Sequence, residues 1–232
     1  MIIALDYPAL PPALEMARRL VGQVGMFKVG LELFNSAGPQ VMGELRALGA
    51  RVFYDAKFYD IPNTVAGAAA AAGRIGVSMV NVHALGGKAM MEAAKEAAAQ
   101  GAVAAGFPAP LVIAVTVVTS LGDRELREEI GIPQPASEAA LRLALLAKEA
   151  GLDGVVASVA EVREIKRVCG KDFVTVTPGI RPAGAERGDQ VRVATPRQAA
   201  VAGSDYLVIG RPVTRAADPV EAVAAIVTEM SG

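Results

Sequence analysis

The chain has 232 residues, of which 53% are hydrophobic and 20% charged, and its formal net charge is -1. Lysine and arginine are scattered, which leaves no basic surface of the kind that binds nucleic acid or an anionic membrane. A single cysteine excludes an internal disulfide framework and any multi-cysteine metal site.

Short β-branched runs alternate with alanine-rich helical segments along the chain. In chain order, the predicted strands are residues 2–6, 26–30, 51–57, 78–84, 111–119, 154–158, 173–180 and 206–210. The helical segments between them include PPALEMARRLVGQ, PQVMGELRALG, TVAGAAAAAGRIG, GGKAMMEAAKEAAAQG and SEAALRLALLAKEAG, and glycine ends several of these. Apolar strands separated by helices predict a parallel sheet, and eight such units predict a closed (β/α)8 TIM barrel, an α/β fold.

A doubly wound open sheet is the alternative architecture. Because no linker or change in composition divides the chain, we expect residues 1–232 to form a single domain. The amino terminus reaches the charged Asp6 too early for a signal peptide, and Gly106, Pro108 and Pro110 interrupt the uncharged residues 101–122. A membrane span needs roughly 20 continuous apolar residues. We therefore expect a soluble, cytoplasmic protein.

Charged and polar residues stand where the predicted strands end. By strand, they are Asp6 (first), Lys28 (second), Asp55, Lys57 and, just beyond, Asp60 (third), His83 (fourth), Thr119 and Ser120 (fifth), Arg181 (seventh), and Gly210 and Arg211 (eighth). In a barrel these positions share the C-terminal mouth, where active sites of this fold lie. The mouth is therefore the predicted functional site.

Asp55 and Lys57 are two residues apart, so their side chains leave the same face of the strand. Lys28 can join them from the neighbouring strand, whereas Asp60 needs a turn of the chain, or another chain, to reach them. An unpaired buried charge costs several kcal/mol, and an alternating lysine–aspartate array avoids that cost. The pattern predicts either a structural ion-pair network or a catalytic centre.

Two glycine-rich segments, TPGIRPAGAERGDQ (177–190) and VIGRPVTRA (208–216), follow the last two predicted strands. Loops in these places form the recurrent phosphate site of such barrels. Gly210 permits close approach of the backbone, and Arg211, with Arg181 on the adjacent loop, can hold an anion. The only histidine, His83, has two open interpretations, a hydrogen-bonded structural residue or an acid–base group.

The segment DAKFYDIPNT (55–64) fits the pattern D-x-K-x-x-D-I-x-x-T, and with it the chain resembles the orotidine 5'-phosphate decarboxylase family, which catalyses the last step of UMP synthesis. The resemblance also covers FKVGLELF (27–34), VHALGGKAMM (82–91), VTVVTSL (115–121), PGIRPAGAERGDQVRVATP (178–196) and YLVIGRPVTRAADP (206–219). It implies a homodimeric, cofactor-independent carboxy-lyase that binds orotidine 5'-phosphate and UMP, with no metal, nucleic-acid or membrane partner.

The resemblance also implies a role for each matching residue. Lys57 is the expected proton donor, and Asp55, Lys28 and Asp60 are its charged partners. The expected substrate contacts are Asp6 and Lys28 at the ribose, Thr119 and Ser120 at the pyrimidine, and Gln190, Gly210 and Arg211 at the phosphate, with Arg181 at the start of a closing loop. Asp60 and Thr64 are expected to reach the site from the partner subunit, and Ile61 is a further expected substrate contact.

Three other functions fit parts of the pattern. Related sugar-phosphate lyases, 3-keto-gulonate-6-phosphate decarboxylase and hexulose-phosphate synthase, share D-x-K-x-x-D but use Mg²⁺, and they typically carry glutamate where this chain has Lys28. A Schiff-base aldolase would need a lysine with a lowered pKa, whereas Asp55 and Asp60 favour a protonated Lys57. A non-catalytic nucleotide-binding module would bind UMP without turnover.

Overall fold

Eight parallel strands close into a barrel in the computed structural model, which describes residues 1–182 and 192–231. The strands are β1 (Ile2–Ala4), β2 (Met26–Val29), β3 (Val52–Phe58), β4 (Met79–His83), β5 (Leu111–Val115), β6 (Gly154–Val156), β7 (Val174–Thr177) and β8 (Tyr206–Ile209). Each strand pairs with the next in the chain, and β8 pairs with β1, so the ring leaves no open edge. The predicted (β/α)8 TIM barrel is confirmed, and the open-sheet alternative is wrong.

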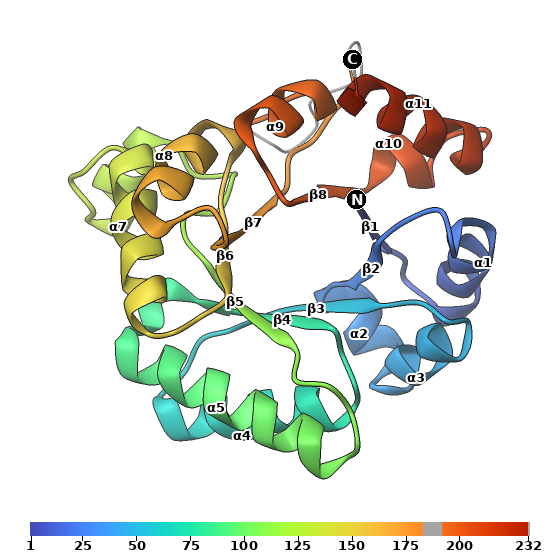
Figure 1. Ribbon diagram of the computed structural model, residues 1–232, viewed down its shortest axis with the longest axis horizontal. Coiled ribbons are helices and arrows are strands. Elements are labelled where there is room, and N and C mark those ends of the chain that lie inside the picture. The colour runs from blue at the N-terminus through green and yellow to red at the C-terminus, as the bar shows by residue number, and fades with distance from the viewer. Residues whose placement is uncertain (183–191, 232) are drawn as a thin grey trace.

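Helices surround the ring of strands on its outer side (Figure 1). In the described residues they are α1 (Leu10–Leu20), α2 (Leu31–Ala37), α3 (Gln40–Ala47), α4 (Pro62–Arg74), α5 (Lys88–Ala104), α6 (Asp123–Glu125), α7 (Ala136–Glu149), α8 (Val159–Cys169), α9 (Pro196–Ala202), α10 (Arg211–Thr214) and α11 (Pro219–Ser231). A 3-10 turn spans Ala84–Gly86 and a π-helical turn spans Leu126–Ile130. No helix within residues 1–182 and 192–231 is long and apolar enough to cross a membrane.

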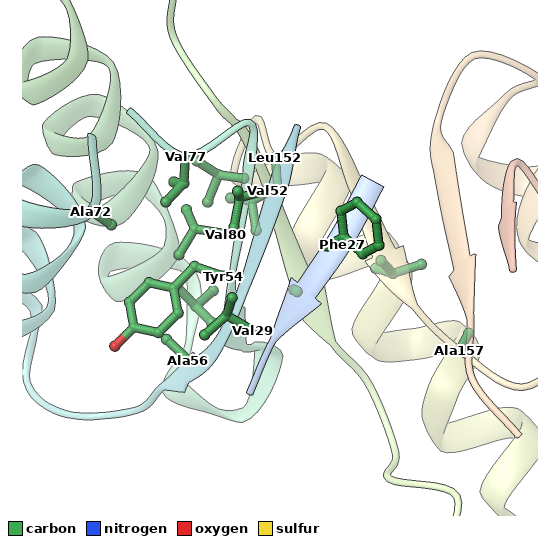
Figure 2. Packing of buried hydrophobic residues seen from close by; sticks show 14 of the residues in the cluster. Phe27, Val29, Val52, Tyr54, Ala56, Ala72, Val77, Val80, Leu152 and Ala157 are labelled. Atoms are coloured by element: carbon green, nitrogen blue, oxygen red, sulfur yellow. The ribbon is translucent and has the colours of Figure 1, made fainter. Parts of the chain in front are cut away.

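Side chains alternate between two apolar layers, as the two-residue period of a strand requires. Phe27, Val29, Val52, Tyr54 and Ala56 belong to the outer cluster, between strands and helices (Figure 2). The residues between these point the other way, into the barrel. There a second, smaller cluster fills the interior with Ile2, Ala4, Met26, Phe53, Met79, Ile113, Val176 and Val208. The interior of the barrel is therefore a packed core and not a channel.

The fifth strand is shorter than the sequence predicts, because β5 ends at Val115 and not at residue 119. Val117 and Val118 have the β-branched side chains typical of strands. Their neighbour β6, however, has three residues and ends at Val156, and Thr116 already donates its N–H to the Val156 carbonyl. Since no further strand backbone is available there, Thr119 and Ser120 lie in the connection after the strand.

Helices α4 and α5 approach each other closely enough for their backbones to touch. A Cβ atom added at Gly73 would lie 2.2 Å from the Ala98 carbonyl oxygen, and one at Gly101 would lie 2.2 Å from that of Ala70. Glycine is therefore required at both positions for this packing. The contact fixes α4, which begins directly after the third strand and carries Thr64 in its first turn.

Candidate active site

The two-residue alternation that directs apolar side chains into the interior core also directs the site residues into the space above it. Asp6, Lys28 and Asp55 each stand two residues after an inward-facing member of the interior cluster, Ala4, Met26 and Phe53. They therefore face into the barrel, one layer nearer its C-terminal mouth. A cavity of about 340 Å³ opens there, and all three residues line it together with Lys57.

The four charged groups form a chain of ion pairs. Lys28 Nζ lies 3.2 Å from both Asp6 Oδ1 and Asp55 Oδ2, and Lys57 Nζ lies 2.6 Å from Asp55 Oδ1. The Lys28 and Asp55 side chains are only 11% and 12% exposed, against 59% for Asp6. At an effective dielectric near 20, one ion pair at 3.2 Å contributes roughly 5 kcal/mol, which offsets the cost of removing the two charges from water.

Burial alone would raise the pKa of Asp55, but Lys28, Lys57 and the hydrogen bonds from Lys57 and Asn81 together hold it below its usual value. For Lys28 the balance is similar, since burial lowers its pKa while Asp55 and Asp6 raise it above the usual value. Both groups are therefore charged at neutral pH. A Cβ atom at Gly30 would lie 2.9 Å from Lys28 Nζ, so a glycine there leaves room for the ammonium.

Strand β3 is irregular where it carries the two central charges. Lys57 has a φ of 52°, in the left-handed region that non-glycine residues rarely adopt. Its backbone N–H donates to Asn81 Oδ1 over 2.7 Å, and Asn81 Nδ2 donates to Asp55 Oδ1, also over 2.7 Å. A backbone of this kind costs about 1–3 kcal/mol and persists only where surrounding contacts hold it.

The loops after β5, β7 and β8 supply the opposite wall of the cavity. Thr119, Ser120, Arg181, Gly210 and Arg211 all line it, as the sequence predicts for strand-end residues. Arg181 donates from Nη1 to the Ile180 carbonyl over 2.9 Å. The predicted phosphate contact Gln190 lies outside the described residues.

The third-strand segment places three predicted residues away from this cavity. Asp60, Ile61 and Thr64 are exposed beyond the end of β3, and among the described residues none of them lines the cavity. Asp60 instead accepts the Ile61 N–H at 2.6 Å, next to the start of α4. The chain thus brings Asp6, Lys28, Asp55 and Lys57 together but leaves Asp60 at the rim.

His83 ends β4 beside the array. Its ring lies 5.7 Å from that of Tyr59, centroid to centroid. Burial lowers the pKa of the imidazole, and the nearby Lys57 ammonium lowers it further, while Asp55 opposes them. The imidazole is therefore neutral at physiological pH.

Two residues that hold parts of the site in place were not predicted from the sequence. Asn81 occupies the inward position two residues after Met79, so the strand period signals its direction but not its partners. Arg192 donates to Glu161 Oε1 over 2.7 Å and to the carbonyls of Val117 and Val118. Its guanidinium therefore holds the connection after β5, and no sequence signal could have identified it.

No group of three or more histidine, cysteine or acidic side chains suited to a metal ion occurs in residues 1–182 and 192–231. The space between the Asp6 and Asp55 carboxylates holds the Lys28 ammonium, whereas Mg²⁺ requires oxygen ligands.

Comparisons with known proteins agree with the resemblance seen in the sequence. Residues 1–226 match the model of the orotidine 5'-phosphate decarboxylase / HUMPS family. The chain is 56% identical over 229 residues to an orotidine 5'-phosphate decarboxylase of Moorella thermoacetica, covering 99% of this chain and 91% of the relative. It is 53% identical over 231 residues to that of Syntrophotalea carbinolica, covering 100% and 94%. The crystal structure of the Lactobacillus acidophilus orotidine 5'-phosphate decarboxylase is 39% identical and superposes with a TM-score of 0.84, over 100% of this chain and 99% of that one.

Proposed function

The chain belongs to the orotidine 5'-phosphate decarboxylase / HUMPS family and is a carboxy-lyase, and we propose that it converts orotidine 5'-phosphate to UMP and CO₂, the last step of de novo UMP biosynthesis. The observation that carries this proposal is the ion-paired chain of Asp6, Lys28, Asp55 and Lys57 in the cavity wall. Within this chain, the Lys57 ammonium would supply fixed positive charge to a carbanion formed in the cavity.

The reaction breaks the bond between C6 of the pyrimidine and its carboxylate, and the electron pair stays on C6 while CO₂ leaves. The ring does not delocalise this pair as an enolate would, so stabilisation depends on a preorganised charge. The Lys57 ammonium is suited to provide this charge. It faces the C6 carbanion, then gives it a proton, so that an N–H bond breaks, a C6–H bond forms and Lys57 is left neutral until solvent reprotonates it. Asp55 stands next to the departing carboxylate.

The remaining cavity residues have proposed roles in holding the substrate. Asp6 and Lys28 bind the ribose hydroxyls, and Thr119 and Ser120 contact the pyrimidine edge. Arg211, the Gly210 backbone, Gln190 and Arg181 hold the phosphate and the loop that closes over it. Binding energy from the non-reacting phosphate is then available to orient the ring against Lys57.

The ion pairs in the cavity wall argue against the sugar-phosphate lyase alternative. Those enzymes coordinate Mg²⁺ with carboxylates, whereas here the Lys28 ammonium, 3.2 Å from Asp6 and from Asp55, already neutralises both. A divalent cation placed there would repel the ammonium and find too few oxygen ligands. The charge pattern therefore favours a metal-independent reaction.

We further propose that the active unit is a homodimer with composite sites, in which Asp60, Ile61 and Thr64 enter the cavity of the partner subunit. The large apolar side chains Leu31, Tyr59, Ile61 and Leu85 follow the ends of three neighbouring strands, β2, β3 and β4, and are 43–66% exposed. A cluster of this kind on one rim is typical of an interface. Asp60 lies in its midst and would add its charge to the partner's array.

The test of the function is turnover of orotidine 5'-phosphate in the presence of EDTA, followed by absorbance and by identification of UMP and CO₂. Turnover that disappears with EDTA and returns with Mg²⁺ would indicate the sugar-phosphate lyase chemistry. UMP binding without any CO₂ release would indicate a non-catalytic nucleotide-binding protein.

A further inference from the structure

We infer that Asn81 is a positioning residue for the decarboxylation, because its side chain holds the left-handed backbone of Lys57 and the carboxylate of Asp55 in one fixed arrangement. This inference rests on the proposed function of Lys57 and Asp55. It concerns a residue that does not line the substrate cavity.

The pairing of β3 with β4 shows why such a residue is needed. Tyr54 pairs with Val80 and Phe58 pairs with Val82, so three residues of β3 stand opposite the single residue Asn81. This bulge takes the Lys57 N–H out of the regular ladder of hydrogen bonds, while the φ of Lys57 becomes 52°. A strained backbone of this kind requires a partner that the ladder no longer provides.

The Asn81 carboxamide is suited to this task. It is 1% exposed, so water does not replace its contacts. Its oxygen accepts the Lys57 N–H at 2.7 Å, and its nitrogen donates to Asp55 Oδ1 at 2.7 Å. An amide side chain has an acceptor and a donor on one short planar group, which neither a carboxylate nor a hydroxyl of similar reach offers with the same geometry.

The bond from Asn81 to Asp55 reaches the Lys57 ammonium through a shared oxygen atom. Asp55 Oδ1 accepts from Asn81 and also from Lys57 Nζ at 2.6 Å, while Oδ2 faces Lys28 at 3.2 Å. Asn81 therefore fixes Lys57 at both ends, its backbone directly and its ammonium through Asp55. Without Asn81, the bulge is free to relax to an extended backbone and to carry the ammonium away from C6.

The experiment compares Asn81→Leu, which keeps the branched shape of the side chain and removes both hydrogen bonds, with Thr175→Val as a matched control. Thr175 is also fully buried and bonds to a carboxylate, that of Asp205, but at the opposite end of the barrel. For Asn81→Leu we expect kcat for orotidine 5'-phosphate to fall about 100-fold, while UMP affinity changes less than about threefold. For Thr175→Val we expect a lower melting temperature with kcat within about threefold of wild type.

A merely structural role for Asn81 predicts a different outcome, in which both variants lose melting temperature and neither loses kcat; that result would overturn the inference. Equal losses of kcat and UMP affinity in Asn81→Leu would overturn it as well. If Asn81→Leu does not fold, Asn81→Asp takes its place. The aspartate can still accept the Lys57 N–H but sets a second carboxylate against Asp55, and we again expect lower kcat with UMP affinity retained.

A crystal structure of the Asn81 variant separates this inference from the proposed function. We expect the φ of Lys57 to leave the positive region whatever the reaction is. Absence of turnover in the wild-type protein would reject the proposed function. A Lys57 backbone that keeps its φ of about 50° in the variant would reject the positioning role of Asn81.

Discussion

Replacing Lys57 by methionine tests the proposed proton donor most directly. The substitution keeps an unbranched side chain and removes the ammonium. Asp55 then retains Lys28 at 3.2 Å and the Asn81 amide at 2.7 Å, so its buried carboxylate is not left unpaired. We therefore expect the variant to fold and its melting temperature to change little.

The effect on turnover follows from the charge that is lost. The ammonium contacts Asp55 Oδ1 at 2.6 Å, and a comparable contact of about 3 Å to an anionic carbon contributes roughly 5 kcal/mol at an effective dielectric near 20. That free energy corresponds to about 10⁴-fold in rate. Loss of the proton donor adds a further factor of about 10² or more. We expect kcat to fall by at least about 10⁴-fold.

The assay is the change in absorbance as orotidine 5'-phosphate is consumed, with UMP affinity measured by calorimetry on the same samples. UMP binding should be largely retained, because the main interaction of Lys57 is made with the developing carbanion. Lys95→Met is the matched control, since Lys95 pairs with Asp153 at 2.6 Å at the other end of the barrel. A Lys57→Met enzyme with near wild-type turnover would falsify the assignment of Lys57 as proton donor.

Four further outcomes are expected. Arg211→Ala should weaken phosphorylated ligands about 10- to 100-fold, the value of one charge-assisted bond, and orotidine hardly at all; an equal loss for both ligands places Arg211 outside the phosphate site. Mixing the two inactive variants Lys57→Ala and Asp60→Ala under subunit exchange should restore about one quarter of wild-type activity, because each heterodimer regains one intact site, whereas no recovery despite exchange means that Asp60 acts within its own subunit. Arg192→Met should lower the free energy of unfolding by about 3–5 kcal/mol in denaturant titrations, because it leaves the Glu161 carboxylate, 4% exposed, without its cation, and an unchanged midpoint contradicts this. The pKa of Asp55 is lowered from 3.8, so its contribution to stability is present above that pH and is lost as pH falls through the folded-state pKa. Asp55→Asn should therefore flatten this acid dependence of the melting temperature, and a variant with the wild-type pH profile would contradict this contribution of Asp55.

The sequence alone determined the barrel and the place of its site. Strand and helix periods are local properties, and eight repeats of them leave few alternatives to closure. The same period set the inward direction of Lys28 and Asp55, since a residue two positions after a core residue shares its face. The pattern of charges at strand ends therefore located the mouth residues without any knowledge of their contacts.

Only the tertiary structure decided how these residues meet. The left-handed backbone of Lys57 and its bond to Asn81 arise from the register between β3 and β4. Thr119 lies outside β5, although the sequence predicted it inside, because the neighbouring strand β6 ends early. Arg192 and Glu161 lie 31 residues apart and meet through packing of the loops. Register, strand end and loop contact each depend on the neighbouring segment as much as on the residue itself, because a ladder hydrogen bond or a buried ion pair exists only where a second part of the chain supplies the partner.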